Sequence, residues 1–89
     1  MPYILQAKRD NIDPKIEEAL NMAADGKLAA GDINYIFTRF MLAYMIGRGK
    51  SYQNMNDLVG AIEACKLEFY RRYVANYEQM KAGMNGDVY

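Results

Sequence analysis

The stretch LVGAIEACKLEFYRRYVANYEQM, residues 58–80, decides the fold of this chain. Its apolar residues recur at spacings of three and four, which places them on one face of an α-helix. The same spacing starts slightly earlier, so that the apolar face comprises Met55, Leu58, Ile62, Cys65, Phe69, Tyr73, Tyr77 and Met80. We therefore predict one long C-terminal helix near residues 55–82.

This helix is too long for a compact subunit of 89 residues. No Pro interrupts it, and its N-cap candidates are Ser51, Asn54 and Asn56. At 1.5 Å per residue it would be roughly 39 Å long, whereas the expected radius of gyration of a compact domain of this size is about 12 Å. We therefore expect a partner subunit to cover the aromatic rings of its second half.

A first short helix is predicted near residues 14–24. Asp13 is a suitable N-cap, and Pro14 fits the first helical position because its φ is fixed. The dipeptide Asp25-Gly26 would end this helix.

A second helix is predicted near residues 33–47, with Asp32 as its N-cap. The two glycines of Gly47-Arg48-Gly49 would end it, since Gly is a poor helix former and a good C-cap.

These elements make one all-α, three-helix domain over residues 1–89, assembled as an oligomeric helical bundle. Residues 1–12 are interpreted as an N-terminal arm, extended at Pro2–Leu5 and able to form a short helical turn at Gln6–Asn11, and residues 84–89 as a tail. Two interpretations of the tail stay open: a frayed end, or a docked arm whose Val88 and Tyr89 fill a groove or pair with Tyr3–Leu5.

Composition excludes several classes of protein. Eleven Lys and Arg balance eleven Asp and Glu, whereas nucleic-acid-binding domains are usually basic, so a nucleic-acid partner is disfavoured. No apolar run is long enough to span a membrane, and the N-terminus does not read as a signal peptide, so we expect a cytoplasmic protein.

The sequence lacks the groups of residues that a catalytic site or a metal site requires. The chain has no His, and Cys65 is its single Cys, so we expect no metal site and no cofactor. Glu17 and Glu18 point in different directions around a helix, and Glu63 and Glu68 diverge as well. We therefore predict a protein that is not an enzyme, in which Cys65 is a small buried apolar residue.

The segment Gly47-Arg48-Gly49-Lys50-Ser51 ends like a phosphate-binding loop. A P-loop of this kind needs a further Gly at the position of Tyr44, and it must follow a β-strand. Neither condition is met, so we reject a P-loop that binds nucleoside triphosphates. Arg48 and Lys50 could still hold an anion at a helix start, but an ordinary turn between helices explains the segment as well.

Basic and aromatic residues alternate on the long helix at Lys66, Tyr70, Arg71 and Arg72. They could stack a base and bind a phosphate. Alternatively, Glu68 lies three and four residues before the two arginines, so ion pairs within the helix would explain them.

Eight Tyr in 89 residues favour a contact surface, because Tyr combines a large apolar area with a polar tip. We expect this homo-oligomer interface to include Phe69, Tyr73, Tyr77, Val88 and Tyr89.

Four segments of the sequence are distinctive: MPYI at 1–4, DINYIFTR at 32–39, CKLEFYRR at 65–72 and NGDVY at 85–89. Through these segments the chain resembles, over nearly its whole length, a family of small proteins of unknown function found in bacteria and their phages. The resemblance implies a phage or prophage setting, hence the host cytoplasm, and no catalytic residue. Members of that family carry a Pro where this chain has Asn76, so the long helix is expected to be smoother here.

The sequence thus predicts a non-enzymatic oligomeric binding module, and two mechanisms remain open. In one, the chain holds or blocks a larger host or phage protein through its tyrosine-rich surface. In the other, it is an anti-defence sponge that sequesters a nucleotide immune signal. The anion pocket of such a sponge would be lined, at subunit junctions, by Arg48, Lys50, Lys66, Tyr70, Arg71 and Arg72.

Overall fold

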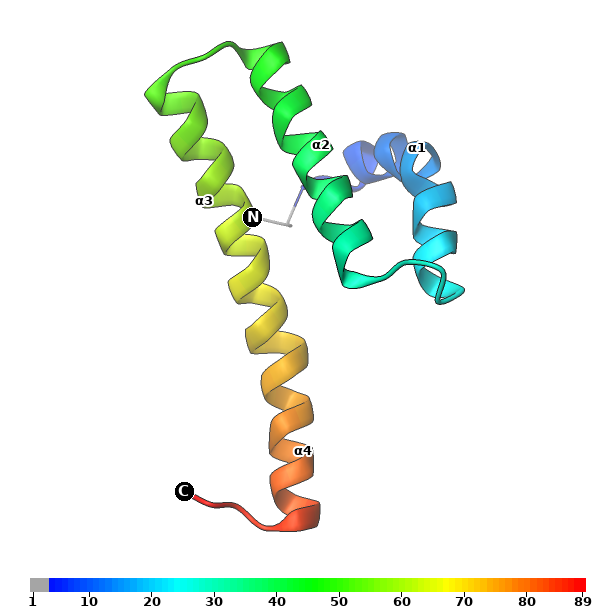
Figure 1. Cartoon of the computed structure of the whole chain (residues 1–89), viewed down its shortest axis with the longest axis vertical. Coiled ribbons are helices and arrows are strands. Elements are labelled where there is room, and N and C mark those ends of the chain that lie inside the picture. Colours follow the sequence, from blue (N-terminus) through cyan, green and yellow to red (C-terminus); the bar gives the residue numbers. More distant parts are fainter. Residues whose placement is uncertain (1–3) are drawn as a thin grey trace.

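The computed structural model describes residues 4–89 and is all-α over that range, which confirms the predicted fold class. Its elements are α1 (Gln6–Ala24), α2 (Ala30–Arg48), α3 (Tyr52–Phe69), the π-helical segment η1 (Tyr70–Val74) and α4 (Ala75–Asn85). The last three follow one another without a break and form a single rod, with α2 antiparallel to its first half (Figure 1).

The rod begins at one of the predicted caps. The Ser51 hydroxyl accepts the backbone N–H of Asn54 at 3.1 Å, which satisfies one of the free donors of the first helical turn. The Asn54 side-chain amide donates in turn to the carbonyls of Arg48, at 3.1 Å, and Gly49, at 2.9 Å. Gly49 has a φ of +94°, which L-residues with a side chain rarely adopt. The segment that resembles a phosphate-binding loop is therefore a tightly bonded turn between two helices.

The predicted start of the first helix at Asp13-Pro14 is wrong, because α1 begins at Gln6 and Pro14 lies inside it. Residues 6–12 are thus helix rather than part of an arm, while residues 1–3 lie outside the described part. A Pro within a helix removes one backbone hydrogen bond at a cost of about 3 kcal/mol. Side-chain bonds from Gln6 to Asp10, at 2.8 Å, and from Lys15 to Asn11, at 3.0 Å, support the turns around it.

The second helix also begins earlier than predicted, at Ala30 rather than Ile33. Asp32 is not its N-cap. Instead, the Asp32 carboxylate reaches back and accepts the backbone N–H of Ala29 at 2.9 Å. This is the return half of a capping box, in which an acidic residue at the third helical position serves the cap residue.

The long helix contains one irregular segment, η1, where the N–H of Ala75 bonds the carbonyl of Tyr70 five residues before it. The spacing of the rings gives a physical reason. Cys65, Phe69, Tyr73 and Tyr77 follow one another in steps of four, which overshoots the 3.6-residue α turn. A π turn takes about one residue more, so η1 keeps the rings on one face. The Asn76 side chain donates to the carbonyl of Arg72 at 2.7 Å beside this turn. That the helix is smoother than in family members with a Pro at position 76 stays a prediction.

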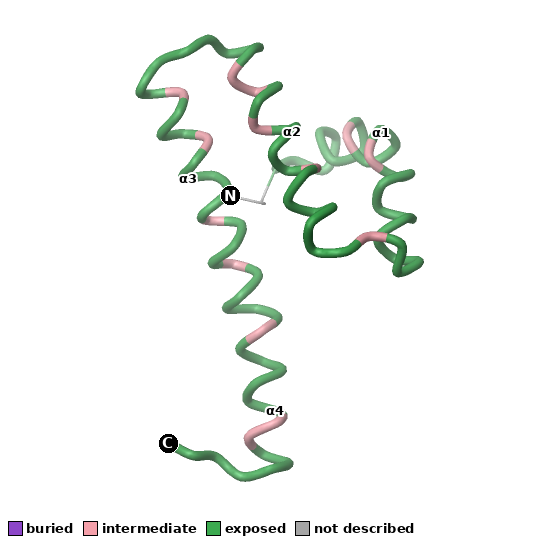
Figure 2. Tube along the Cα trace, viewed as in Figure 1, coloured by how far each residue is buried: buried purple, intermediate pink, exposed green. Residues whose placement is uncertain are grey.

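The subunit has no closed core. None of residues 4–89 is buried, and those that are partly covered are scattered along the helices (Figure 2). The radius of gyration is 16.6 Å and the longest extent is 50 Å. A compact chain of 89 residues would have a radius of gyration of about 12 Å. The first half of the long helix, from Leu58 to Cys65, was expected to be core for the shorter helices. It is not, since only Leu58 and Ala64 within it are even half-buried.

Replacing Asn54 by Ala should lower the free energy of unfolding by about 1–2 kcal/mol, because the turn loses hydrogen bonds to two carbonyls. Chemical denaturation at fixed subunit concentration measures this change. Asn56→Ala, two residues further along α3, is the matched control, since the Asn56 side chain makes no hydrogen bond to the carbonyls of the turn. Equal effects of the two substitutions would contradict the role of Asn54.

Candidate interaction surface

An uncovered apolar hollow lies between α1 and α2. We call it the α1–α2 groove. It has a volume of about 410 Å³, and the side chains of Ile12, Ile16 and Leu20 on one helix face those of Ile33, Phe37 and Phe40 on the other across it. Ile12 precedes Pro14, so the early start of α1 extends the groove by a further turn. The groove is apolar and open, which is typical of a surface that another chain covers.

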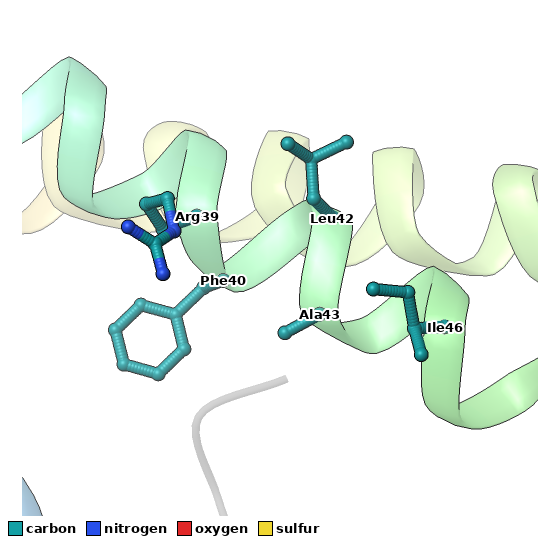
Figure 3. Close-up of a pocket in the computed structure, with 5 residues that line it drawn as sticks. All are labelled: Arg39, Phe40, Leu42, Ala43 and Ile46. Carbon is teal, nitrogen blue, oxygen red and sulfur yellow. The ribbon is translucent and has the colours of Figure 1, made fainter.

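The outer face of α2 is apolar as well. Figure 3 shows Leu42, Ala43 and Ile46 with Arg39 as their polar neighbour, while Phe40 points to the opposite side from Leu42 and also lines the α1–α2 groove. Ile46 is 85 % exposed. This face was not identified from the sequence. The available signal was that α2 is apolar nearly all round, which is a property of helices buried on several sides.

The third uncovered surface is the apolar face of the rod, which we call the long-helix stripe. Its members are Leu58, Ile62, Cys65, Phe69, Tyr73, Tyr77, Met80 and Met84. The exposed fraction is 39 % at Ile62, 57 % at Phe69 and 68 % at Tyr73, and it stays above half at Tyr77 and Met80. The rings of Phe69 and Tyr73 stack with centroids 5.1 Å apart and planes 10° from parallel.

The residues predicted for the interface are thus all exposed in the single subunit. Phe69, Tyr73 and Tyr77 share the stripe, and Val88 and Tyr89 project from the tail after Gly86. The two tail residues fill no groove of their own subunit. Cys65, expected to be buried, is exposed as well, since nothing in the subunit covers this part of the stripe.

Lys66, Arg71 and Arg72 pair with acidic residues of the same rod, whereas Lys81 lies over the ring of Tyr77. Glu68 accepts from Arg71 at 2.7 Å and from Arg72 at 3.2 Å, which confirms the interpretation as ion pairs within the helix. Lys66 lies 3.0 Å from Glu63. Such exposed pairs contribute about 0.3–0.5 kcal/mol each.

Tyr70 is held by its own acidic neighbour. Its hydroxyl donates to the Glu78 carboxylate at 3.1 Å, across the π turn. This bond, together with the negative charge of Glu78, raises the pKa of Tyr70 above its usual value.

The six predicted ligand-binding residues do not form one site within a subunit. Arg48 and Lys50 lie at the turn between α2 and α3, and Arg48 rests over the ring of Tyr44 at 5.9 Å. Lys66 follows about 20 Å further along the rod. A shared pocket would need residues from neighbouring subunits.

Among residues 4–89, no group of three or more His, Cys, Asp or Glu side chains could hold a metal ion. None of the helices in this range is long and apolar enough to cross a membrane.

The chain belongs to the family described as Domain of unknown function (DUF6899), whose model matches residues 1–88. Neither a curated protein nor a solved structure matches it. The family therefore accounts for the resemblance of the motifs and names no activity.

Replacing Tyr73 and Tyr77 together by Ser should weaken association, since two large rings leave the stripe. Central aromatic residues of interfaces cost about 2 kcal/mol or more each when truncated, so the dissociation constant should rise by more than about tenfold. Sedimentation velocity over a dilution series measures this. Tyr52→Ser, at the exposed start of α3, is the matched control. Lower stability without any dependence on dilution would place the two rings in the fold of a single subunit instead.

Proposed function

We propose that this chain is a non-enzymatic binding module that folds as an obligate oligomer. The observation that supports this most is the exposed area. The subunit exposes 7977 Å², whereas a compact monomer of 10.2 kDa exposes about 5,300 Å². The excess is about 2,700 Å² per subunit, or about 5,400 Å² for a pair, which is at the upper end of the total area that permanent oligomers bury.

The same area argues against a stable single subunit. An unfolded chain of this mass exposes about 14,800 Å², so the subunit at 7977 Å² removes only about 46 % of it from water. Domains of 60 residues already remove about 60 %. Because conformational entropy opposes folding in proportion to chain length, the missing burial has to come from another copy.

The function proposed for the assembly is to hold or block a partner protein in the host cytoplasm, in the phage or prophage setting that the motifs imply. Three open apolar surfaces favour this role: the α1–α2 groove, the outer face of α2 and the long-helix stripe. One self-association interface need not use all three, so an assembled oligomer can keep one for a different protein.

Light scattering on the purified chain tests the oligomer. We expect a mass of at least two subunits at micromolar concentration and a melting temperature that rises with protein concentration, since association stabilises by mass action. A fully folded monomer with a melting temperature independent of concentration would overturn the proposal.

A second candidate function is sequestration of a nucleotide immune signal. The feature that favours it is the stacked Phe69–Tyr73 pair beside Arg72, which together line one hollow of the rod. Rings offer a base a stacking surface, and guanidinium groups bind phosphate. Arg72 already pairs with Glu68, so a ligand would have to compete with that carboxylate.

Thermal shift against mono-, di- and cyclic nucleotides tests this second function. A ligand at about 100 times its dissociation constant should stabilise the protein by about 2.7 kcal/mol, which is easily visible as a higher melting temperature. Replacing Arg71 and Arg72 by Gln should abolish the shift, whereas Arg9→Gln on α1 should leave it. No response to any nucleotide in the set would remove this candidate and leave the protein-binding role.

A further inference from the structure

We infer that two copies of this chain pair along their rods in antiparallel orientation, about a two-fold axis near Arg71. This inference rests on the proposed oligomer and goes beyond it, since it assigns the orientation, the register and the residues that meet. It is carried by the spacing of the long-helix stripe, by the sizes of its side chains and by the reach of α2.

From Leu58 to Met84 the stripe reads the same in both directions, with spacings of 4, 3, 4, 4, 4, 3 and 4 that are symmetric about residue 71. Met55, the first residue of the predicted apolar face, lies outside this symmetric part, since its counterpart about residue 71 is Asp87 in the tail. The extra residue at the centre of the symmetric part is the one that η1 absorbs while keeping the rings on one face. Turning a second rod end over end about this point therefore places every apolar residue of one stripe level with an apolar residue of the other. Phe69 meets Tyr73 of the partner subunit, and Cys65 meets Tyr77 of the partner subunit.

Side-chain size favours this orientation over a parallel one. The first half of the stripe carries the smaller residues, among them Ile62 and Cys65, and the second half carries Tyr73 and Tyr77. In a parallel pair, two Cys65 side chains would share one layer and two Tyr77 rings another, so the rods could not keep a constant separation. The antiparallel register avoids both of these layers, because it sets the small Cys65 against the large Tyr77 of the partner subunit, as well-packed helix interfaces require.

The length of α2 points to the same orientation. The rod runs from Tyr52 to Asn85, about 51 Å at 1.5 Å per residue, while α2 with 19 residues reaches about 28 Å. Each α2 therefore covers the first half of its own rod only (Figure 1). An antiparallel partner brings its α2 beside the uncovered second half. In a parallel pair, both α2 helices would lie at the same end and both second halves would stay bare.

The same register gives the exposed tail a neighbour. Asn85, the last residue of α4, is level with Asp57 of the partner subunit. The tail, in which Val88 is 91 % exposed, therefore leaves the rod beside the partner's α2–α3 turn.

Disulfide cross-linking of the full chain tests the register, because Cys65 is its single Cys. In the antiparallel pair the two Cys65 residues are about 18 Å apart along the rods, beyond the reach of a disulfide. Tyr77→Cys places a second thiol opposite Cys65. Mild oxidation with oxidised glutathione should convert most of this variant to covalent dimer, while the native chain runs as a monomer on a denaturing gel. Gln79→Cys, on the opposite side of the rod, is the matched control and should stay monomeric.

Tyr77→Cys also removes a ring from the interface, so a second variant keeps Tyr73 and Tyr77 and places the thiols elsewhere. This variant is Cys65→Ser/Ile62→Cys/Met80→Cys. Its two new thiols are too far apart to pair within one chain, so a covalent dimer supports the register. Cross-linking of native Cys65 to itself, in a protein that light scattering shows to be oligomeric, would overturn the antiparallel orientation and leave the oligomer. An oligomer in which neither variant cross-links would overturn the register. A monomer would overturn this inference and the proposed function together.

Discussion

An apolar helix face can be stable in water only where something covers it, and in this chain the covering elements are shorter than the face. The rod extends from Tyr52 to Asn85, and α2 can lie against only about half of it. Everything else about the subunit follows from that mismatch: its 50 Å length, its lack of any buried residue among those described, and the ring stack at Phe69 and Tyr73 that faces water.

The features that could be predicted from the sequence are those governed by short-range rules. Helical spacing identified the three helices, and Ser51 was correctly among the candidate caps, because a cap depends on a bond to a residue three positions away. The early start of α1 could not be predicted from such short-range rules. Pro14 is a strong local signal for a helix start. Ile12 and Ile16, however, both line the groove against α2, and they share that face only if the helix continues through Pro14. The π turn at Tyr70–Val74 was hidden for a related reason, since its cause is a spacing of four continued over three steps rather than any single residue.

Of the candidate surfaces, the aromatic residues of the long-helix stripe could be predicted from the sequence, whereas the aliphatic residues of α1 and α2 could not. Tyr73 and Tyr77 stood out because rings are conspicuous on a helix too long to be covered. Ile46 and the α1–α2 groove did not, because α2 was assumed to be satisfied by its own neighbours. The ion pairs of Glu68 were predictable from spacing alone, since residues three and four apart on a helix are adjacent whatever the rest of the fold does.

The pairing of charges along the rod bears on what the protein can bind. Lys66 and Arg72 are each matched by a carboxylate one turn away, so the rod presents rings and ion pairs rather than a net positive surface. An anionic ligand could stack on Phe69 and Tyr73, but it would have to displace Glu68 from the two arginines. The loss of those ion pairs would offset much of the electrostatic attraction between the ligand and the arginines. A protein partner needs no such exchange, because apolar burial against the groove or the outer face of α2 leaves the ion pairs in place. The electrostatics of the rod thus favour an apolar contact with another chain over the capture of a phosphate.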